Sequence, residues 1–355
     1  MDELVELASR LIAIDSVNPA LVAGGAGERE CVRALAAWCD AHGLEVLIVG
    51  DDARPSLIAR TPNRTGRSLL LNGHLDTVGV AGMRGPFEPR LEGGRLYGRG
   101  SYDMKGAIAA LCVAAAHTDA NVIVTAVADE ELASVGTEEI LRHVEADAAI
   151  VAEPTDLQVA IAHRGFAGFE LETKGVAAHG SRPDLGEDAI VKMGPILVAL
   201  EELDARLQEG ARHPLAGTGA VHASTIEGGQ EMSSYPARCV LMGERRTIPG
   251  ETVHDVEREL RALAGDAEVR ILAHRDPFEA DPQHEFVQLV QRVARTELVG
   301  APFWTDAALI ADAGIPTVLL GPAGEGAHAE VEWVDVASLH RLRDLVLEIA
   351  QAWCG

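Results

Sequence analysis

Residues 105–131 read KGAIAALCVAAAHTDANVIVTAVADEE, and three kinds of segment follow one another within them. Residues 105–116 are apolar at almost every position, which is typical of a buried helix. Residues 122–128 form a short apolar run rich in valine, which is typical of a buried strand. The acidic residues 129–131 come directly after this run. Because ligands bind beyond the carboxyl ends of the strands in open α/β sheets, the segment indicates an α/β fold with acidic side chains at its binding edge.

The same alternation of strands and helices continues on both sides of this segment. Further apolar runs with the length of buried strands are residues 44–49, 56–60, 69–72, 148–152 and 316–320. The pattern of apolar residues predicts further helices at 3–14, 28–42, 135–144, 284–298, 305–313 and 335–353. Strands that alternate with helices predict a mostly parallel sheet that is covered by helices on both faces.

The middle of the chain follows a different pattern. Residues 167–174 alternate between apolar and polar side chains, as a half-exposed strand does. After it the sequence predicts a helix at 188–207, strands at 220–226 and 237–245, a helix at 252–263 and a strand at 268–273. This β-α-β-β-α-β order is that of a ferredoxin-like domain. We therefore expect a larger α/β domain, residues 1–166 and 277–355, with a small α+β domain, residues 167–276, inserted into it.

The composition excludes several classes of partner. The chain has 355 residues with 30 Lys and Arg against 55 Asp and Glu, so its net charge is −25. Without a basic cluster, we expect neither nucleic acid nor a membrane as a partner. The longest apolar stretch, residues 107–116, is too short to span a bilayer, and the acidic first residues differ from a signal peptide. Five scattered cysteines without a CxxC motif suit a reducing compartment, so we expect a cytoplasmic protein.

Residues that can ligate a metal stand at the ends of several predicted strands or in nearby loops. They are His74 and Asp76 after the run 69–72, Asp103 before the helix 105–116, Glu130 and Glu131 after the run 122–128, Glu153 after the run 148–152, and His328 in the glycine-rich loop after the run 316–320. Carboxylates that gather at a dry sheet edge repel one another unless a cation lies between them. Imidazole and carboxylate ligands without thiolate suit Zn²⁺, Mn²⁺ or Co²⁺. The set therefore predicts one or two divalent ions with open positions for water and substrate.

The spacing within two pairs of these residues indicates different roles for their members. Each residue alone has a purely structural explanation, such as a core histidine or a helix N-cap, but their coincidence favours a site. His74 and Asp76 have the spacing that places two side chains on one face of an extended chain, so Asp76 could accept the second ring N–H of His74. The adjacent Glu130 and Glu131 cannot point the same way. One of them can ligate a metal while the other acts as a general base.

Seven short stretches with polar or glycine-rich motifs are spread over nearly the whole chain: Gly73–Thr77, Gly98–Gly106, Asp129–Gly136, Glu153–Thr155, Ala178–Pro183, Arg246–Glu251 and Ala327–Glu332. In these stretches, and in their order, the chain resembles the co-catalytic metallopeptidases and deacylases of peptidase family M20. This family includes acetylornithine deacetylase, succinyl-diaminopimelate desuccinylase, aminoacylase and carboxypeptidase G2.

The resemblance implies a centre of two metal ions, with zinc as the expected metal and cobalt or manganese as alternatives. Each ion would have three protein ligands with one shared residue: His74, Asp103 and Glu153 for one ion, and Asp103, Glu131 and His328 for the other. By the same resemblance, Glu130 is the general base and Asp76 supports His74. The peptide bond between Asp103 and Met104 is expected to be cis.

The resemblance also gives a role to the inserted domain. It corresponds to the lid of the family, which usually forms the interface of a homodimer. His179 matches a lid histidine that stabilises the oxyanion, often in the active site of the partner subunit, and Arg246 matches an arginine that contacts the substrate carboxylate. Ser233 stands where many relatives have asparagine, and Glu244 stands where many have aspartate. These two departures leave the chemistry intact but leave the substrate open.

We therefore expect a metal-dependent hydrolase that cleaves the amide bond of a small N-acyl amino acid, in the manner of acetylornithine deacetylase. The alternatives within hydrolases are a dipeptidase, an exopeptidase similar to carboxypeptidase G2, and a succinyl-diaminopimelate desuccinylase. From other classes, a non-catalytic binding protein on the same fold and a structural protein that uses only its lid are the alternatives. The complete set of ligands and base speaks against both of these.

Overall fold

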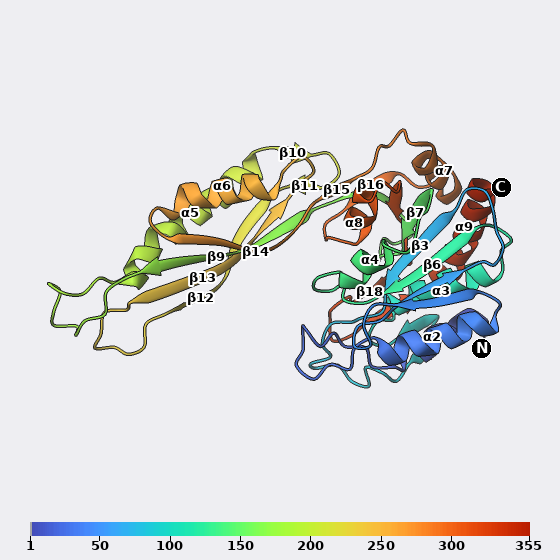
Figure 1. The fold of residues 1–355 in the computed structure, drawn as a ribbon, viewed down its shortest axis with the longest axis horizontal. Coiled ribbons are helices and arrows are strands. Elements are labelled where there is room, and N and C mark those ends of the chain that lie inside the picture. Colours follow the sequence, from blue (N-terminus) through green and yellow to red (C-terminus); the bar gives the residue numbers. More distant parts are fainter. Residues whose placement is uncertain (1) are drawn as a thin grey trace. The chain divides into compact units, whose positions relative to one another are not determined.

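The computed structural model describes residues 2–355, which fold into two compact units (Figure 1). The first unit contains the chain up to Ile161 together with Ala280–Val299 and Thr305–Gly355, and the second contains Ala162–Glu279 and Gly300–Trp304. The second unit therefore extends beyond both ends of the range 167–276 expected from the sequence. Its short contribution from residues 300–304 has no signal in the sequence.

A mixed sheet forms the centre of the first unit, with the strand order β1-β2-β6-β3-β7-β17-β8. The strands are β1 (Glu45–Val49), β2 (Ser56–Arg60), β3 (Leu69–His74), β6 (Val122–Val127), β7 (Ala148–Val151), β17 (Thr317–Leu319) and β8 (Val159–His163). The strands β6, β3, β7 and β17 are parallel, as predicted, while β1, β2 and β8 are antiparallel to their neighbours. Every residue of β3, β6 and β7 is buried, which explains why these runs are continuously apolar.

Helices cover the sheet on both faces. The helix α3 (Lys105–Ala116) packs on β3 and β6 and also contacts α1 (Glu3–Ile12) and α9 (Val336–Cys354). Because α3 is buried from Lys105 to Ala115, it is apolar all round rather than amphipathic. The other helices of this unit are α2 (Arg29–Ala41), α4 (Val135–Ile140), α7 (Glu285–Ala294) and α8 (Ala307–Asp312).

A second, smaller sheet of the first unit was not predicted. Its order is β18-β19-β5-β4, from β4 (Arg90–Glu92), β5 (Arg95–Tyr97), β18 (Gly324–Glu325) and β19 (Trp333–Asp335). These strands have two or three residues each, which is too short to give a pattern in the sequence. The sheet brings residues 95–97 beside residues 333–335, so the loops that follow β5 and precede β19 become neighbours.

The second unit is a ferredoxin-like domain, as predicted. Its sheet has the order β12-β13-β9-β14, from β9 (Gly165–Lys174), β12 (Ala220–Gly228), β13 (Arg238–Thr247) and β14 (Glu268–Arg275). The helices α5 (Ala189–Glu209) and α6 (Val253–Ala264) pack on one face of this sheet (Figure 1). Phe169, Leu171, Met193, Leu241 and Leu260 belong to the core between them.

Four more short strands complete the elements. The strands β10 (Arg212–His213) and β11 (Gly217–Thr218) pair with each other, while β15 (Phe278–Glu279) and β16 (Leu298–Ala301) pair with β8. The sequence predicted a helix up to residue 298, but α7 ends at Ala294. Arg295 has φ 59°, a left-handed conformation that ends the helix.

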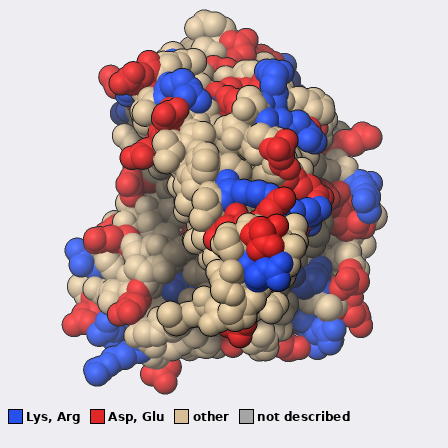
Figure 2. All heavy atoms as spheres, turned by 90° about the vertical axis from the view of Figure 1, so that its left-hand side faces the viewer, with Lys and Arg blue, Asp and Glu red and all other residues tan. Residues whose placement is uncertain are grey.

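Charges of both signs lie on the face drawn in Figure 2. Figure 2 shows acidic and basic side chains interspersed on the face drawn, with neutral areas between them. In residues 2–355, the helices include none that is long and apolar enough to cross a membrane.

Candidate metal centre and active site

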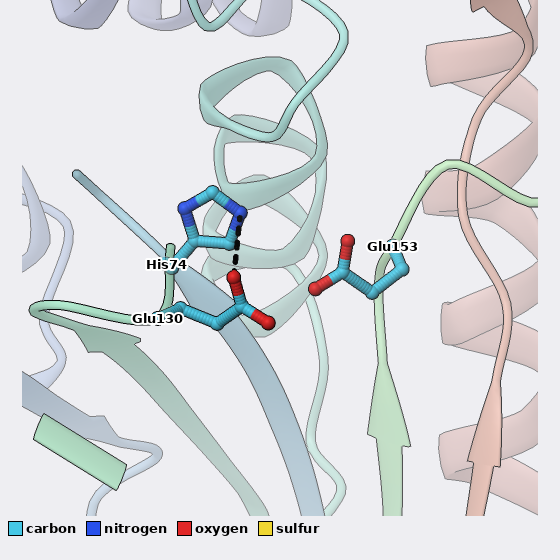
Figure 3. Close-up of side chains that lie close together, drawn as sticks. All are labelled: His74, Glu130 and Glu153. Carbon is cyan, nitrogen blue, oxygen red and sulfur yellow. Dashed lines mark ion pairs between the residues drawn. The ribbon is translucent and has the colours of Figure 1, made fainter. Parts of the chain in front are cut away.

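Three neighbouring parallel strands place three candidate ligands side by side. His74 is the last residue of β3, Glu130 follows β6, and Glu153 follows β7, and the sheet order is β6-β3-β7. Parallel strands end at the same edge of the sheet, so the three side chains point toward one another (Figure 3). The Nε2 atom of His74 lies 4.0 Å from Oε2 of Glu130. One ligand atom each from His74, Glu130 and Glu153 lie within 4.8 Å of one another.

Asp103 lies between the two candidate histidines. Its Oδ1 is 3.0 Å from Nε2 of His74, and its Oδ2 is 3.3 Å from Nε2 of His328. His328 also lies 3.1 Å from Oε2 of Glu131. A carboxylate with one oxygen facing each histidine has the arrangement that a ligand shared by two metal ions requires. The peptide bond between Asp103 and Met104 is cis, as the resemblance implied.

Burial shifts the pKa of most carboxyls in this cluster. The pKa of Glu130 is raised well above its usual value by desolvation and by the charge of Glu153. The pKa of Glu153 is raised in the same way, by desolvation and by Asp103. For Asp103 the burial is outweighed by hydrogen bonds from His328 and His74, which hold its pKa below the usual range. Hydrogen bonds to Asp103 and Glu131 raise the pKa of His328 to about 10.

These residues fit a pair of divalent cations. Oε1 of Glu153 is buried and, within residues 2–355, has no hydrogen-bond partner. The ligand atoms are imidazole nitrogens and carboxylate oxygens, which Zn²⁺, Co²⁺ and Mn²⁺ accept. Nε2 of His328 faces a carboxylate oxygen of both Asp103 and Glu131, and a cation between these groups would satisfy the same oxygens.

Asp76 contacts the cluster in a different way from the one expected. Nδ1 of His74 lies 2.9 Å from the backbone oxygen of Asp76 and 3.6 Å from its carboxylate, so the backbone carbonyl is the hydrogen-bond acceptor. The carboxylate of Asp76 instead accepts from the backbone N–H groups of Glu130, at 3.1 Å, and Glu131, at 3.2 Å. The turn between His74 and Asp76 departs from the extended chain assumed in the sequence analysis, because β3 ends at His74.

A hydrogen-bond network behind Asp76 was not found from the sequence. The amide of Asn18 donates to Asp76, at 2.8 Å, and to Asp129, at 2.9 Å, and is completely buried. Arg54 donates to Asp129 and forms a bidentate pair with Glu28. Asp129 has φ 66°, so this network holds the turn that carries Glu130 and Glu131 in an unusual conformation. Asn18 and Arg54 are far away in the sequence, and no spacing connects them to the site.

Asp306 is a further buried carboxyl that the sequence analysis did not assign. It occupies the N-cap position directly before α8, but its side chain makes no capping hydrogen bond to the helix. Its Oδ2 instead accepts a hydrogen bond of 2.6 Å from the hydroxyl of Thr137. Burial raises the pKa of Asp306 to about 6. Its negative charge contributes to the raised pKa of Glu130 and of Glu153. From the sequence, an acidic residue at the start of a helix is typical of an ordinary N-cap.

The three predicted residues of the inserted domain lie on the second unit. Nδ1 of His179 lies 2.8 Å from the hydroxyl of Ser181, and both residues are exposed. The backbone oxygen of Ser233 accepts from Gly180, so Ser233 and His179 lie on adjoining segments. Arg246 lies on β13, pairs with Glu244 at 2.6 Å, and has its guanidinium 5.7 Å from the ring centroid of Phe166.

Comparison with known proteins gives matches along the whole chain. Residues 70–352 match the model of peptidase family M20/M25/M40. The chain is 30% identical over 387 residues to the acetylornithine deacetylase of Klebsiella pneumoniae strain 342, which covers 99% of this chain and 97% of that protein. It is 28% identical over 375 residues to the acetylornithine deacetylase of Proteus mirabilis strain HI4320, with 99% and 96% covered.

Solved structures share the fold. An M20 family metallo-carboxypeptidase from Sulfolobus solfataricus matches with a TM-score of 0.81 at 19% identity, over 99% of both chains. A dinuclear metal-binding peptidase of the M20 family from Bacillus subtilis matches with a TM-score of 0.74 at 17% identity, over 99% of this chain and 97% of that one. Because the family match spans most of the sequence, this chain belongs to peptidase family M20/M25/M40.

Proposed function

We propose that this protein is a metal-dependent amidohydrolase that removes the acyl group from a small N-acyl amino acid. The observation that carries the proposal is the convergence of two histidines and four carboxylates at one edge of the sheet. The identity of about 30% with acetylornithine deacetylases over the whole chain supports a deacylase. The family also contains peptidases, so a dipeptidase, a carboxypeptidase and a desuccinylase are the alternatives within the same chemistry.

We further propose that the centre holds two divalent ions, with zinc as the expected metal. His74 and Glu153 would hold one ion, His328 and Glu131 the other, and Asp103 would be shared. The ions would polarise the substrate carbonyl and lower the pKa of the attacking water. The name of the Bacillus subtilis structure, a dinuclear metal-binding peptidase, supports the number of ions.

Glu130 is the residue proposed to move the proton. It is 10% exposed in its side chain and lies beside His74, so its carboxylate is at the edge of the ligand set. Its raised pKa suits a group that takes a proton from water and later gives it to the leaving amine. His74, Glu130 and Glu153 lie close enough together that either glutamate could bind the ion held by His74. We assign this ligand to Glu153, because its Oε1 has no hydrogen-bond partner in the described chain.

We propose roles in catalysis and substrate binding for three residues of the second unit. We propose that His179 stabilises the oxyanion that develops on the substrate carbonyl, and that Arg246 binds the free carboxylate of the amino acid. Ser233 would lie near the substrate. These roles rest on the family resemblance. The adjoining segments of His179 and Ser233 are compatible with them.

The second unit also has the features of a dimer interface. The strand β12 is an edge strand of its sheet, and residues 222–228 are exposed. Exposed apolar residues continue onto the adjacent helix α5, where Ile190, Val191, Leu197 and Val198 are 37% to 69% exposed. An unpaired edge next to an apolar stripe favours association with a second copy. We therefore propose that the protein forms a homodimer through this surface. We also propose that the protein is cytoplasmic.

The test of the function is hydrolysis of a small panel by the protein loaded with Zn²⁺ or Co²⁺. The panel contains N-acetylornithine, N-acetylmethionine, N-succinyl-diaminopimelate, an N-acyl glutamate and several dipeptides. We expect turnover of an N-acetyl amino acid above the dipeptides, loss of activity with a chelator, and its return with metal. Activity that survives complete metal removal, as checked by elemental analysis, would contradict the metal-dependent mechanism.

The variant Glu130→Gln tests the general base. It keeps the shape of the side chain but cannot accept the proton, so kcat should fall by about 10² to 10⁴. Metal content should stay at the wild-type value. Glu145→Gln, a neutralised carboxylate at an exposed position, is the matched control and should leave kcat unchanged. A kcat for Glu130→Gln within about tenfold of wild type, roughly 1.4 kcal/mol, would assign the base to another residue.

Metal should stabilise the protein more as the pH rises. Asp306, Glu130 and Glu153 have raised pKa values in the folded state, so above pH about 4 the folded protein binds more protons than the unfolded one. Without metal, the protein therefore loses stability as the pH rises from about 4 and through about 6, the pKa of Asp306. Zn²⁺ neutralises these charges, so the gain in Tm between chelator and Zn²⁺ should grow from pH 5 to pH 7.5. A gain in Tm that is constant or falls with pH would count against a metal ion bound next to these carboxylates.

Substitutions at the two edges of the second unit test the dimer. Ile226→Lys on β12, where Ile226 is 49% exposed, should convert a dimer into a monomer in sedimentation experiments. Leu272→Lys on β14, the other edge of the same sheet, is the matched control, since Leu272 is 54% exposed. It should leave the dimer intact. A wild-type protein that sediments as a monomer at all concentrations would refute the proposed interface.

A further inference from the structure

Glu332 lies at the point where two loops of the first unit meet. It follows the loop of His328 and stands directly before β19, and it is 1% exposed. Its Oε1 accepts from the backbone N–H groups of Tyr102, at 2.9 Å, and Asp103, at 3.1 Å. Its Oε2 accepts from the N–H of Gly100 at 3.0 Å. One side chain thus binds three backbone donors of the loop that carries Asp103.

Arg99 extends this contact to the loop of His328. Its Nη1 donates to Oε2 of Glu332 at 2.6 Å, in a pair that is almost fully buried. Its Nη2 donates to the backbone oxygen of Ala329, the residue after His328, at 3.0 Å. The Arg99–Glu332 pair therefore connects the loop that carries Asp103 with the loop that carries His328. Ionised partners make such hydrogen bonds shorter and stronger than neutral ones.

The geometry of Asp103 depends on this anchor. Its two oxygens face His74 and His328 separately, at 3.0 Å and 3.3 Å. The backbone of its loop contains Gly100 at φ 78°, a conformation that local preferences alone do not favour for other residues. Since the N–H of Asp103 itself is held by Glu332, the position of the carboxylate between the histidines follows from the position of Glu332.

We propose that Glu332 is a positioning residue that fixes the carboxylate of Asp103 between the two metal-binding halves of the site. The inference rests on the proposed function, because it assumes that Asp103 is the shared ligand. Glu332 itself binds no metal in this account: its oxygens are occupied by the amides and by Arg99. Its effect passes through the backbone of Asp103. Substitution of a residue that orients a metal ligand without binding the metal typically lowers metal affinity or activity by about 10- to 100-fold.

The variant Glu332→Gln tests the proposal, because it keeps the length of the side chain but replaces one acceptor oxygen with an NH₂ group. That group would face N–H donors. The metal-free variant is titrated with Co²⁺ alone by calorimetry and by visible absorption. We expect affinity for at least one of the two Co²⁺ ions to fall by about 10- to 100-fold, and kcat to fall while KM stays within about threefold. Glu330→Gln, at an exposed carboxylate two positions away, is the matched control and should bind Co²⁺ as wild type does.

Other outcomes overturn the proposal. If Glu332→Gln binds two Co²⁺ ions with wild-type affinity, Glu332 does not position the shared ligand. If Glu332→Gln and the shorter, still charged Glu332→Asp both fail to fold in circular dichroism, Glu332 serves the fold and the positioning role is refuted. A wild-type protein that binds no Co²⁺ would instead refute the proposed function on which the inference rests. The two failures are thus distinguishable.

Discussion

Repulsion among buried carboxylates is the constraint on which this site depends. Glu130, Glu131 and Glu153 follow parallel strands, and the charges of Asp103 and Asp306 act on them from nearby loops. Desolvation raises the pKa of most of these carboxyls. A folded protein would not keep such a cluster for stability, because an uncompensated buried charge destabilises the folded state. The two histidines compensate part of this charge, since His74 lies 3.0 Å from Asp103 and His328 lies 3.1 Å from Glu131. Divalent cations would compensate it more completely, and they would give the cluster its chemistry.

Buried polar side chains around the site fix the backbone segments that carry these carboxylates. Asp76 binds the backbone of Glu130 and Glu131, and Asn18 joins Asp76 to Asp129. On the other side, Glu332 binds the backbone of the Asp103 loop. In each case a buried side chain with several hydrogen bonds fixes a main-chain segment, and that segment carries the ligand. The ligands are therefore positioned mainly through their backbones, while the parallel strands of the sheet supply the common edge.

The sequence predicted those parts of the fold that local patterns determine. The buried runs of β3, β6 and β7 and the apolar helix α3 were found nearly to the residue, and the inserted ferredoxin-like domain follows from its order of elements. The short strands β4, β5, β18 and β19 were missed because two or three residues show no periodicity. Candidate ligands could be found because each follows a predicted strand or lies in a loop beside one. Asn18, Arg54 and Asp306 could not, because their link to the site is purely three-dimensional.

We propose that two divalent ions share Asp103. The most direct measurement is anomalous diffraction from crystals of the protein grown with Zn²⁺. We expect two anomalous peaks, about 3.5 to 4 Å apart, one next to His74 and Glu153 and the other next to His328 and Glu131, with Asp103 in contact with both. A single peak, or peaks that do not contact Asp103, would contradict it.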